Sequence, residues 1–202
     1  MHGIHLISNG RLTEQHMQLV SEQIAQINYI HLREKTKTAK EILEMIDFLL
    51  EAGVPAERII INDRVDVASI KKCCGVQLAY HSIPVADVKR SFPALRIGKS
   101  VHSLEEAITA EHNGADFLIY GHIFSSNSKP GLEPRGITAL ADVTKNVSIP
   151  VIAIGGITLQ NMNQVQEVGA SGVAIMSGVW DAEDPTEAIK CYRQALDSRV
   201  GE

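Results

Sequence analysis

Short apolar runs with the character of β-strands recur along the chain at intervals of roughly 25 residues. Eight such runs lie in residues 3–7, 29–33, 58–61, 75–78, 95–98, 116–120, 151–154 and 173–176. Most are too short for buried helices, and they are rich in Ile, Val and Leu. We therefore expect eight strands, each followed by a helix.

Between the runs the apolar period changes from two residues to 3.6, as expected for helices that cover a sheet. The clearest example is the apolar face formed by Ile42, Leu43, Ile46, Leu49 and Leu50, which Gly53 and Pro55 end. Start signals stand before three predicted helices: Thr38 with Glu41, Ser103 with Glu106, and Asp184-Pro185-Thr186-Glu187.

Eight strand–helix units in 202 residues predict an α/β fold, a single (β/α)8 TIM barrel that occupies residues 1–202 as one domain. An open, doubly wound sheet is the alternative. That fold would be favoured by a G-x-G-x-x-G turn after an early strand, and the sequence has none.

Composition narrows the classes of function. A net charge of −5, a pI near 5.9 and the lack of a basic run argue against a nucleic-acid partner. No apolar run approaches the roughly 20 residues of a membrane span, and the first residues lack the features of a signal peptide. We expect a cytoplasmic protein with no membrane partner, whose three cysteines stay reduced.

Small residues follow the last two predicted strands: Gly155-Gly156 after the seventh and Ser177-Gly178 after the eighth. In this fold the carboxyl ends of the strands carry the active site, and phosphate often binds the loops after strands seven and eight. Backbone N–H groups in such turns, with the helix that follows the first turn, predict a phosphate site. The alternative is that these glycines only let the chain turn.

Other strand ends supply candidate chemistry. After the second strand, His31, Arg33 and Lys35 alternate toward one side, where Arg33 and Lys35 either bind an anion or pair with Glu34 or Glu41. Ser100 follows the fifth strand, His122 the sixth, and Lys129 lies in the long loop from Ser125 to Gly136. Each is either a ligand contact or an ordinary loop residue, and His122 is the candidate for proton transfer.

Several motifs together resemble the thiamin-phosphate synthase superfamily from end to end. They are His31-Leu-Arg33-Glu-Lys35, Ile61-Asn62-Asp63-Arg64-Val-Asp66, Ser100-Val-His-Ser-Leu-Glu-Glu-Ala107, Val151-Ile-Ala-Ile-Gly155-Gly156 and Val173-Ala-Ile-Met-Ser177-Gly178. Within it, Gly121-His122-Ile-Phe124 followed by Lys129-Pro-Gly-Leu-Glu-Pro-Arg135-Gly136 is similar to the thiazole tautomerase branch, TenI.

The departures from the synthase pattern indicate which of the two branches the chain resembles more. A synthase is expected to show Gln at His31, a Gly-Gln-Glu-Asp type segment with a Mg²⁺ ligand at Ala79-Tyr80-His81-Ser82, and Thr-x-Thr-Lys at Ser126–Lys129. Without an acid after the fourth strand, the charge of a departing diphosphate is poorly neutralised. The resemblance therefore favours the tautomerase branch over the synthase.

The tautomerase resemblance implies a metal-independent isomerase of thiamin biosynthesis that takes a small phosphorylated thiazole and needs no cofactor. It implies that Gly155, Gly156, Ser177 and Gly178 bind the phosphate, that Arg33 and Ser100 orient the ring carboxylate, and that His122 shuttles the proton; Lys35 and Lys129 are further substrate contacts. Two alternatives are a Mg²⁺-dependent thiamin-phosphate synthase and a non-catalytic regulatory protein. We also expect a homo-oligomer, either a dimer or a tetramer.

Overall fold

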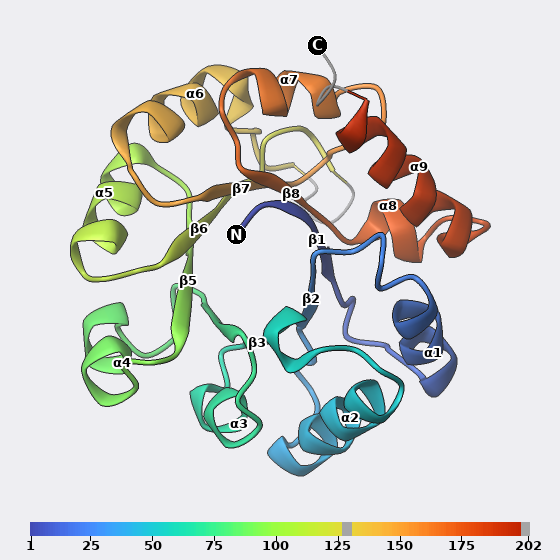
Figure 1. Ribbon diagram of the computed structural model, residues 1–202. Coiled ribbons are helices and arrows are strands. Elements are labelled where there is room, and N and C mark those ends of the chain that lie inside the picture. Colours follow the sequence, from blue (N-terminus) through green and yellow to red (C-terminus); the bar gives the residue numbers. More distant parts are fainter. Residues whose placement is uncertain (127–130, 199–202) are drawn as a thin grey trace.

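In the computed structural model, which describes residues 1–126 and 131–198, eight parallel strands close into a barrel in the order β1 to β8. The strands are β1 (Gly3–Ile7), β2 (Tyr29–Leu32), β3 (Ile59–Asn62), β4 (Gly75–Leu78), β5 (Arg96–Val101), β6 (Phe117–Gly121), β7 (Val151–Ile154) and β8 (Gly172–Ile175). Figure 1 looks down this ring of strands, with the helices around its outside. The predicted (β/α)8 barrel is confirmed.

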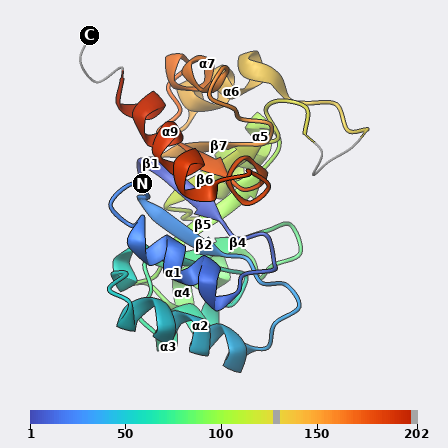
Figure 2. The ribbon, with the colours of Figure 1, turned by 90° about the vertical axis from the view of Figure 1, so that its right-hand side faces the viewer.

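The helices are α1 (Glu14–Glu22), α2 (Ala39–Glu51), η1 (Ala56–Arg58), α3 (Val65–Ile70), α4 (Val85–Ser91), α5 (Leu104–His112), α6 (Gly136–Asn146), α7 (Met162–Glu167), α8 (Ser177–Trp180) and α9 (Pro185–Asp197). Turned by 90°, the molecule shows helices above and below the strands as well (Figure 2). No helix of the described residues combines the length and apolar character that crossing a membrane requires.

Capping follows the sequence signals closely. Thr38 and Glu41 form a complete capping box at α2, and Asp184 accepts hydrogen bonds from two backbone N–H groups at the start of α9. At α5, Ser103 caps the helix, but the Glu106 carboxylate accepts from the backbone of His102 instead. Each cap satisfies N–H groups that a helix start leaves without partners.

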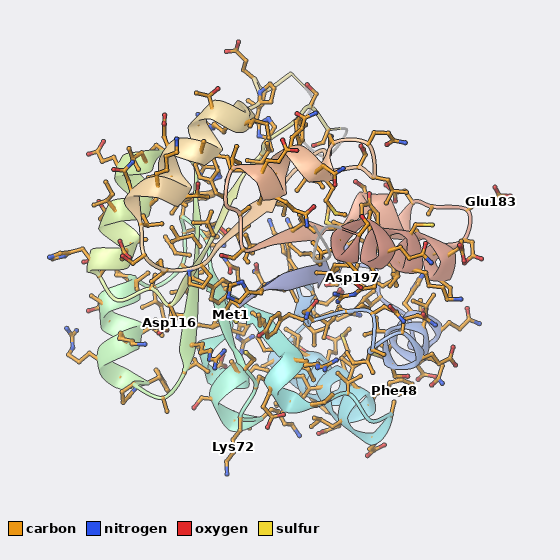
Figure 3. The ribbon with its side chains drawn as sticks, turned by 45° about the horizontal axis from the view of Figure 1, so that its top comes forward. Met1, Phe48, Lys72, Asp116, Glu183 and Asp197 are labelled. Atoms are coloured by element: carbon orange, nitrogen blue, oxygen red, sulfur yellow. The ribbon has the colours of Figure 1, made fainter. Side chains whose placement is uncertain are left out.

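Two hydrophobic clusters hold the barrel. The larger packs the outward side chains of the strands against the helices. The smaller fills the barrel interior with Ile7, Ile60, Phe117, Ile119, Ile152 and Ala174. Met1 packs against this inner cluster at the amino ends of the strands and lies near the centre of the ring in Figure 3.

One glycine lets the interior side chains meet. Gly98 on β5 has no side chain, and an added Cβ would overlap both Oε1 of Gln77 and the ring of Phe117. All three are on strands whose side chains fill the barrel, so the missing Cβ makes room for the larger neighbours. Gly98 is therefore a packing requirement of the barrel interior.

We predict that Gly98→Ala lowers the free energy of unfolding by about 1–3 kcal/mol, the usual cost of overpacking a core. Phe117→Leu in the same chain removes one of the two overlaps. The double variant should then lose less stability in urea unfolding than the sum of the two single variants. Strictly additive losses would contradict this packing account.

Candidate active site

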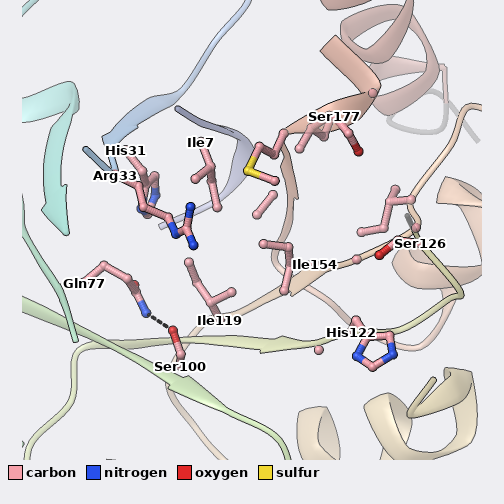
Figure 4. A pocket seen from close by; sticks show the side chains of 18 of the residues that line it. Ile7, His31, Arg33, Gln77, Ser100, Ile119, His122, Ser126, Ile154 and Ser177 are labelled. Carbon is pink, nitrogen blue, oxygen red and sulfur yellow. Dashed lines mark hydrogen bonds between the residues drawn. The ribbon is translucent and has the colours of Figure 1, made fainter. Parts of the chain in front are cut away.

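A cavity of about 590 Å³ opens at the carboxyl ends of the strands, where the barrel interior meets the loops. Its lining includes nearly all of the described residues that the sequence singles out as site residues: Arg33, Lys35, Ser100, His122, Gly155, Gly156, Ser177 and Gly178. Figure 4 shows several of these side chains around the cavity. The predicted contact Lys129 lies outside the described residues. The volume is within the roughly 300–1,000 Å³ typical of small-molecule sites.

At one end of the cavity lie the small residues after β7 and β8. Gly155 and Gly156 have φ of 101° and 65°, a region that side chains with a Cβ rarely adopt. An added Cβ would overlap His122 at Gly155, and the carbonyls of Ser125 and Phe124 at Gly156. These glycines thus bring the β6 and β7 loops together, in addition to any role in binding phosphate.

The two small segments differ from their predicted form. The helix α7 begins only at Met162, five residues after Ile157, so its start does not follow the Gly155-Gly156 turn directly. Ser177 and Gly178 are not a free turn but the first residues of the short helix α8. The first residues of a helix leave their N–H groups without intrahelical partners. The start of α8 therefore adds N–H donors beside this end of the cavity.

The part of the cavity wall that follows β2 carries positive charge. Arg33 and Lys35 line it just beyond β2, and Figure 4 shows Arg33 reaching toward the space beside Ile7 and Ile119. Within the described residues neither cation forms an ion pair. Glu34 is buried with both carboxylate oxygens lacking a hydrogen bond there. The alternative pairing of Arg33 and Lys35 with Glu34 or Glu41 is therefore not observed.

Ser100 and Gln77 connect across β4 and β5. The Gln77 amide nitrogen donates to the Ser100 hydroxyl at 3.0 Å, while Oε1 of Gln77 has no partner among the described residues. Both residues line the cavity. Sequence reasoning missed Gln77, although its signal was present: it is the one polar residue in the run Gly75-Val-Gln-Leu.

His122 follows β6 and is almost fully buried in the cavity wall. Its Nε2 lies 3.3 Å from the carbonyl oxygen of Leu132, which belongs to the loop before α6. The close packing of Gly155 against the Cβ of His122 fixes the backbone on the other side. His122 thus lies between the α6 loop and the phosphate-side turn.

Two buried histidines lie in contact with each other, and one of them, His31, lines the cavity. Nδ1 of His5 is 2.9 Å from Nε2 of His31, and each ring keeps one buried nitrogen without a partner among the described residues. Burial lowers the pKa of His31 to about 3. Burial lowers the pKa of His5 well below its usual value too, and His31 adds to that effect. Both rings are neutral at physiological pH.

We predict a loss of stability as the pH falls from about 6.5 toward 3. The unfolded chain takes up protons at its histidines near pH 6.5, whereas the folded chain leaves His5 and His31 neutral. Each histidine then contributes a slope of about 1.4 kcal/mol per pH unit. His31→Gln should reduce the slope measured by urea unfolding between pH 6 and 4.5 by about that amount.

The control for this prediction is His112→Gln, because His112 is exposed at the end of α5. The free energy of unfolding of the His112→Gln variant should change with pH as steeply as that of the unchanged protein. If His31→Gln leaves the slope unchanged as well, the histidine pair does not titrate on unfolding as described.

Comparisons with known proteins identify the family. The model of the thiamine monophosphate synthase family matches residues 4–179. The chain belongs to this family. It is 40% identical to the thiamine-phosphate synthase of Chlorobium luteolum, over 87% of this chain and 84% of that one. It is 36% identical to the thiamine-phosphate synthase of Pyrococcus abyssi, over 85% and 84% of the two chains.

A solved structure agrees with the sequence relatives. The thiamine phosphate pyrophosphorylase of Pyrococcus furiosus superposes with a TM-score of 0.85 and 31% identity, over 98% of this chain and 97% of that one. Two 3-hexulose-6-phosphate synthases, at 17% and 13% identity, share the fold alone.

These relatives overturn one expectation from the sequence. The isomerase reading, a thiazole tautomerase that moves a proton through His122, is wrong, because relatives at 35–40% identity over most of the chain are named as synthases. The choice of the tautomerase branch was wrong because it gave too much weight to a few positions: His31, residues 79–82 and Ser126–Lys129. Those departures concern a few positions, whereas the similarity spans residues 4–179.

Proposed function

We propose that this chain is a transferase of thiamine biosynthesis that couples a pyrimidine diphosphate to a thiazole phosphate and releases diphosphate. The observation that supports it most is the cavity at the strand ends, which carries one anion-binding end at Gly155, Gly156 and Ser177 and another at Arg33 and Lys35. One substrate carries a phosphate and the other a diphosphate, so each anion-binding end of the cavity would bind one of these groups. The names of the relatives agree with this reaction.

The bond changes follow from the substrates. The lone pair of the thiazole ring nitrogen forms a C–N bond with the carbon that carries the diphosphate. The C–O bond to the diphosphate breaks, and the diphosphate leaves with the electron pair. No oxidant is needed, and no proton has to be removed from the attacking nitrogen. The protein must therefore hold two rings in line and stabilise negative charge on the leaving group.

Each group of residues has a role in that task. The glycines and the first N–H groups of α8 hold the thiazole phosphate, and Arg33 and Lys35 hold the diphosphate. Ser100, positioned by Gln77, offers a hydroxyl to a ring substituent. His122, in the cavity wall, would form a hydrogen bond to the substrate. It also packs against the Gly155-Gly156 turn and supports it.

The family's reaction implies a Mg²⁺ ion at the diphosphate, and we tested whether the residues fit one. Mg²⁺ prefers an octahedral set of oxygen ligands that includes carboxylates. Asp63 and Asp66 follow β3, but Asp66 is paired with Arg64, and residues 79–82 add no carboxylate after β4. Among the described residues, no group of three or more His, Cys, Asp or Glu could hold a metal. The residues do not fit a Mg²⁺ site built by the protein.

The test of the proposed function is direct synthesis. The purified chain is incubated with pyrimidine diphosphate and thiazole phosphate, with and without excess Mg²⁺, and thiamine phosphate is measured by oxidation to its fluorescent thiochrome. We expect product and diphosphate in equal amounts. Product formation no faster than without enzyme under both conditions, while the Pyrococcus furiosus relative is active alongside, would refute the proposal.

A substitution at one end of the cavity should change the kinetic constants for one substrate and not for the other. Arg33→Gln removes a charged hydrogen-bond donor, worth about 1.5–3 kcal/mol, so kcat/KM for pyrimidine diphosphate should fall by about 10- to 150-fold. The KM for thiazole phosphate should change little. Lys40→Gln, on the exposed side of α2, is the matched control and should leave both constants unchanged.

The reciprocal variant lies at the other end. Ser177→Asp places a carboxylate beside the phosphate, and repulsion should raise the KM for thiazole phosphate more than that for pyrimidine diphosphate. If Arg33→Gln and Ser177→Asp weaken the same substrate, the assignment of the two ends is wrong.

A further inference from the structure

The strand ends nearest the cationic wall carry a carboxylate and an imidazole in place of two carboxylates. Asp63 follows β3 and His81 lies three residues beyond β4, with Oδ2 of Asp63 and Nε2 of His81 3.9 Å apart. Both side chains are partly exposed, and His81 lines the cavity. An imidazole is a poor ligand for a hard cation such as Mg²⁺. The pair is therefore a contact between an acid and a base.

The loop after β4 is also built in a way that disfavours a cation. The ammonium group of Lys99 donates to the carbonyl oxygen of Ala79 at 2.6 Å, and the backbone N–H of Ala79 donates to the Ser82 hydroxyl at 2.7 Å. Two oxygens of this loop, the Ala79 carbonyl and the Ser82 hydroxyl, are thus already hydrogen-bonded. A positive charge already lies against one of them, which repels a second cation.

The other carboxylates near Asp63 either form ion pairs with arginines or lie in another part of the cavity. Asp66 forms a two-bond ion pair with Arg64, and Asp87 on α4 pairs with Arg90 at 2.5 Å. Asp181 lines the cavity, but at the end of α8 beside the phosphate-side residues. Residues 127–130 are Asn-Ser-Lys-Pro, so this part of the sequence contains no carboxylate. Glu34 is buried and is not among the residues that line the cavity. Among these described carboxylates, Asp63 therefore has no second acidic partner.

Two permanent cations occupy the same end of the cavity. Arg33 and Lys35 line it and form no ion pair within the described residues. A guanidinium group binds phosphate oxygens through two parallel hydrogen bonds, and an ammonium group adds a mobile charge. Together they supply the charge that a divalent cation would bring to a diphosphate.

We propose that this chain neutralises the leaving diphosphate with Arg33 and Lys35, and that it provides no divalent-cation site because His81 stands where a second carboxylate would be needed. This inference rests on the proposed transferase function. It predicts that one substitution creates the missing site. The side chain of glutamate reaches about as far as that of histidine, so His81→Glu would bring two carboxylates together.

The geometry suits such a substitution. Two oxygens bound to one Mg²⁺ at 2.0–2.1 Å lie at most about 4.2 Å apart. The present separation of 3.9 Å between Asp63 and the ring nitrogen of His81 is within that limit. His81→Gln keeps the size of the new side chain without its charge and is the matched control.

The binding experiment uses Mn²⁺ as the probe, followed by electron paramagnetic resonance on the protein without substrate. We expect no site with a dissociation constant below about 1 mM in the unchanged chain or in His81→Gln. His81→Glu should bind Mn²⁺ at least ten times more tightly, and Mg²⁺ should raise the melting temperature of that variant alone. Tight binding by the unchanged chain, or no gain in His81→Glu, would overturn the inference.

The synthesis assay separates this inference from the proposed function. We expect the rate with EDTA to stay within about threefold of the rate with Mg²⁺, a difference below 1 kcal/mol in barrier height. Product formed only with Mg²⁺ would refute the inference and leave the function intact. No product under either condition would refute the function, and the Mn²⁺ titration would still decide whether the protein holds a cation.

Discussion

The pairing of β1 with β8 is the constraint on which the rest of the structure depends. Four residue pairs, from Gly3 with Gly172 to Leu6 with Ile175, join the first and last strands and close the sheet. At Gly172 an added Cβ would overlap the backbone of Gly3, so the strands can approach only because that side chain is absent. The parallel strands of the closed barrel bring all eight carboxyl ends to one face, where residues as distant in sequence as Ile7 and Tyr192 line one cavity.

That convergence explains why the cavity has two chemically different ends. The β7 and β8 side offers small residues and backbone N–H groups, while the β2 side offers Arg33 and Lys35. Each end uses residues that are close in sequence, and the two ends share one cavity because parallel strands are held in register around the barrel. His5 and His31, of which His31 lines the cavity, show the same principle, since their contact depends on the pairing of β1 with β2.

Much of the fold could be predicted from the sequence because it is encoded locally. Short apolar runs at regular intervals located all eight strands, and Thr38 with Glu41 marked the start of α2. The short helix α8 was missed, because Ser177 and Gly178 are weak helix formers and four residues carry little periodic signal. The His5–His31 contact and the hydrogen bond from Lys99 to Ala79 could not be predicted, since both join separate strands or loops.

The location of the candidate site could be predicted from the sequence, but the reaction could not. Gly155, Gly156, Ser177 and Arg33 do line the cavity, and the sequence could place them there because strand ends are recognisable. Their roles in binding stay predictions. The choice between branches failed because it relied on individual departures, such as His31, whose consequences depend on neighbours that sequence does not reveal. The similarity over residues 4–179 is the stronger guide to the reaction class, and the missing carboxylate bears on how charge is balanced.

The central claim is that one cavity binds two substrates at two separate anion-binding parts of its wall, and a crystal structure with thiamine phosphate bound tests it most directly. The account predicts the product phosphate against Gly156, Ser177 and Gly178, with the pyrimidine ring toward Arg33. A phosphate bound at Arg33 and Lys35, with the ring system lying over the α8 start, would contradict it.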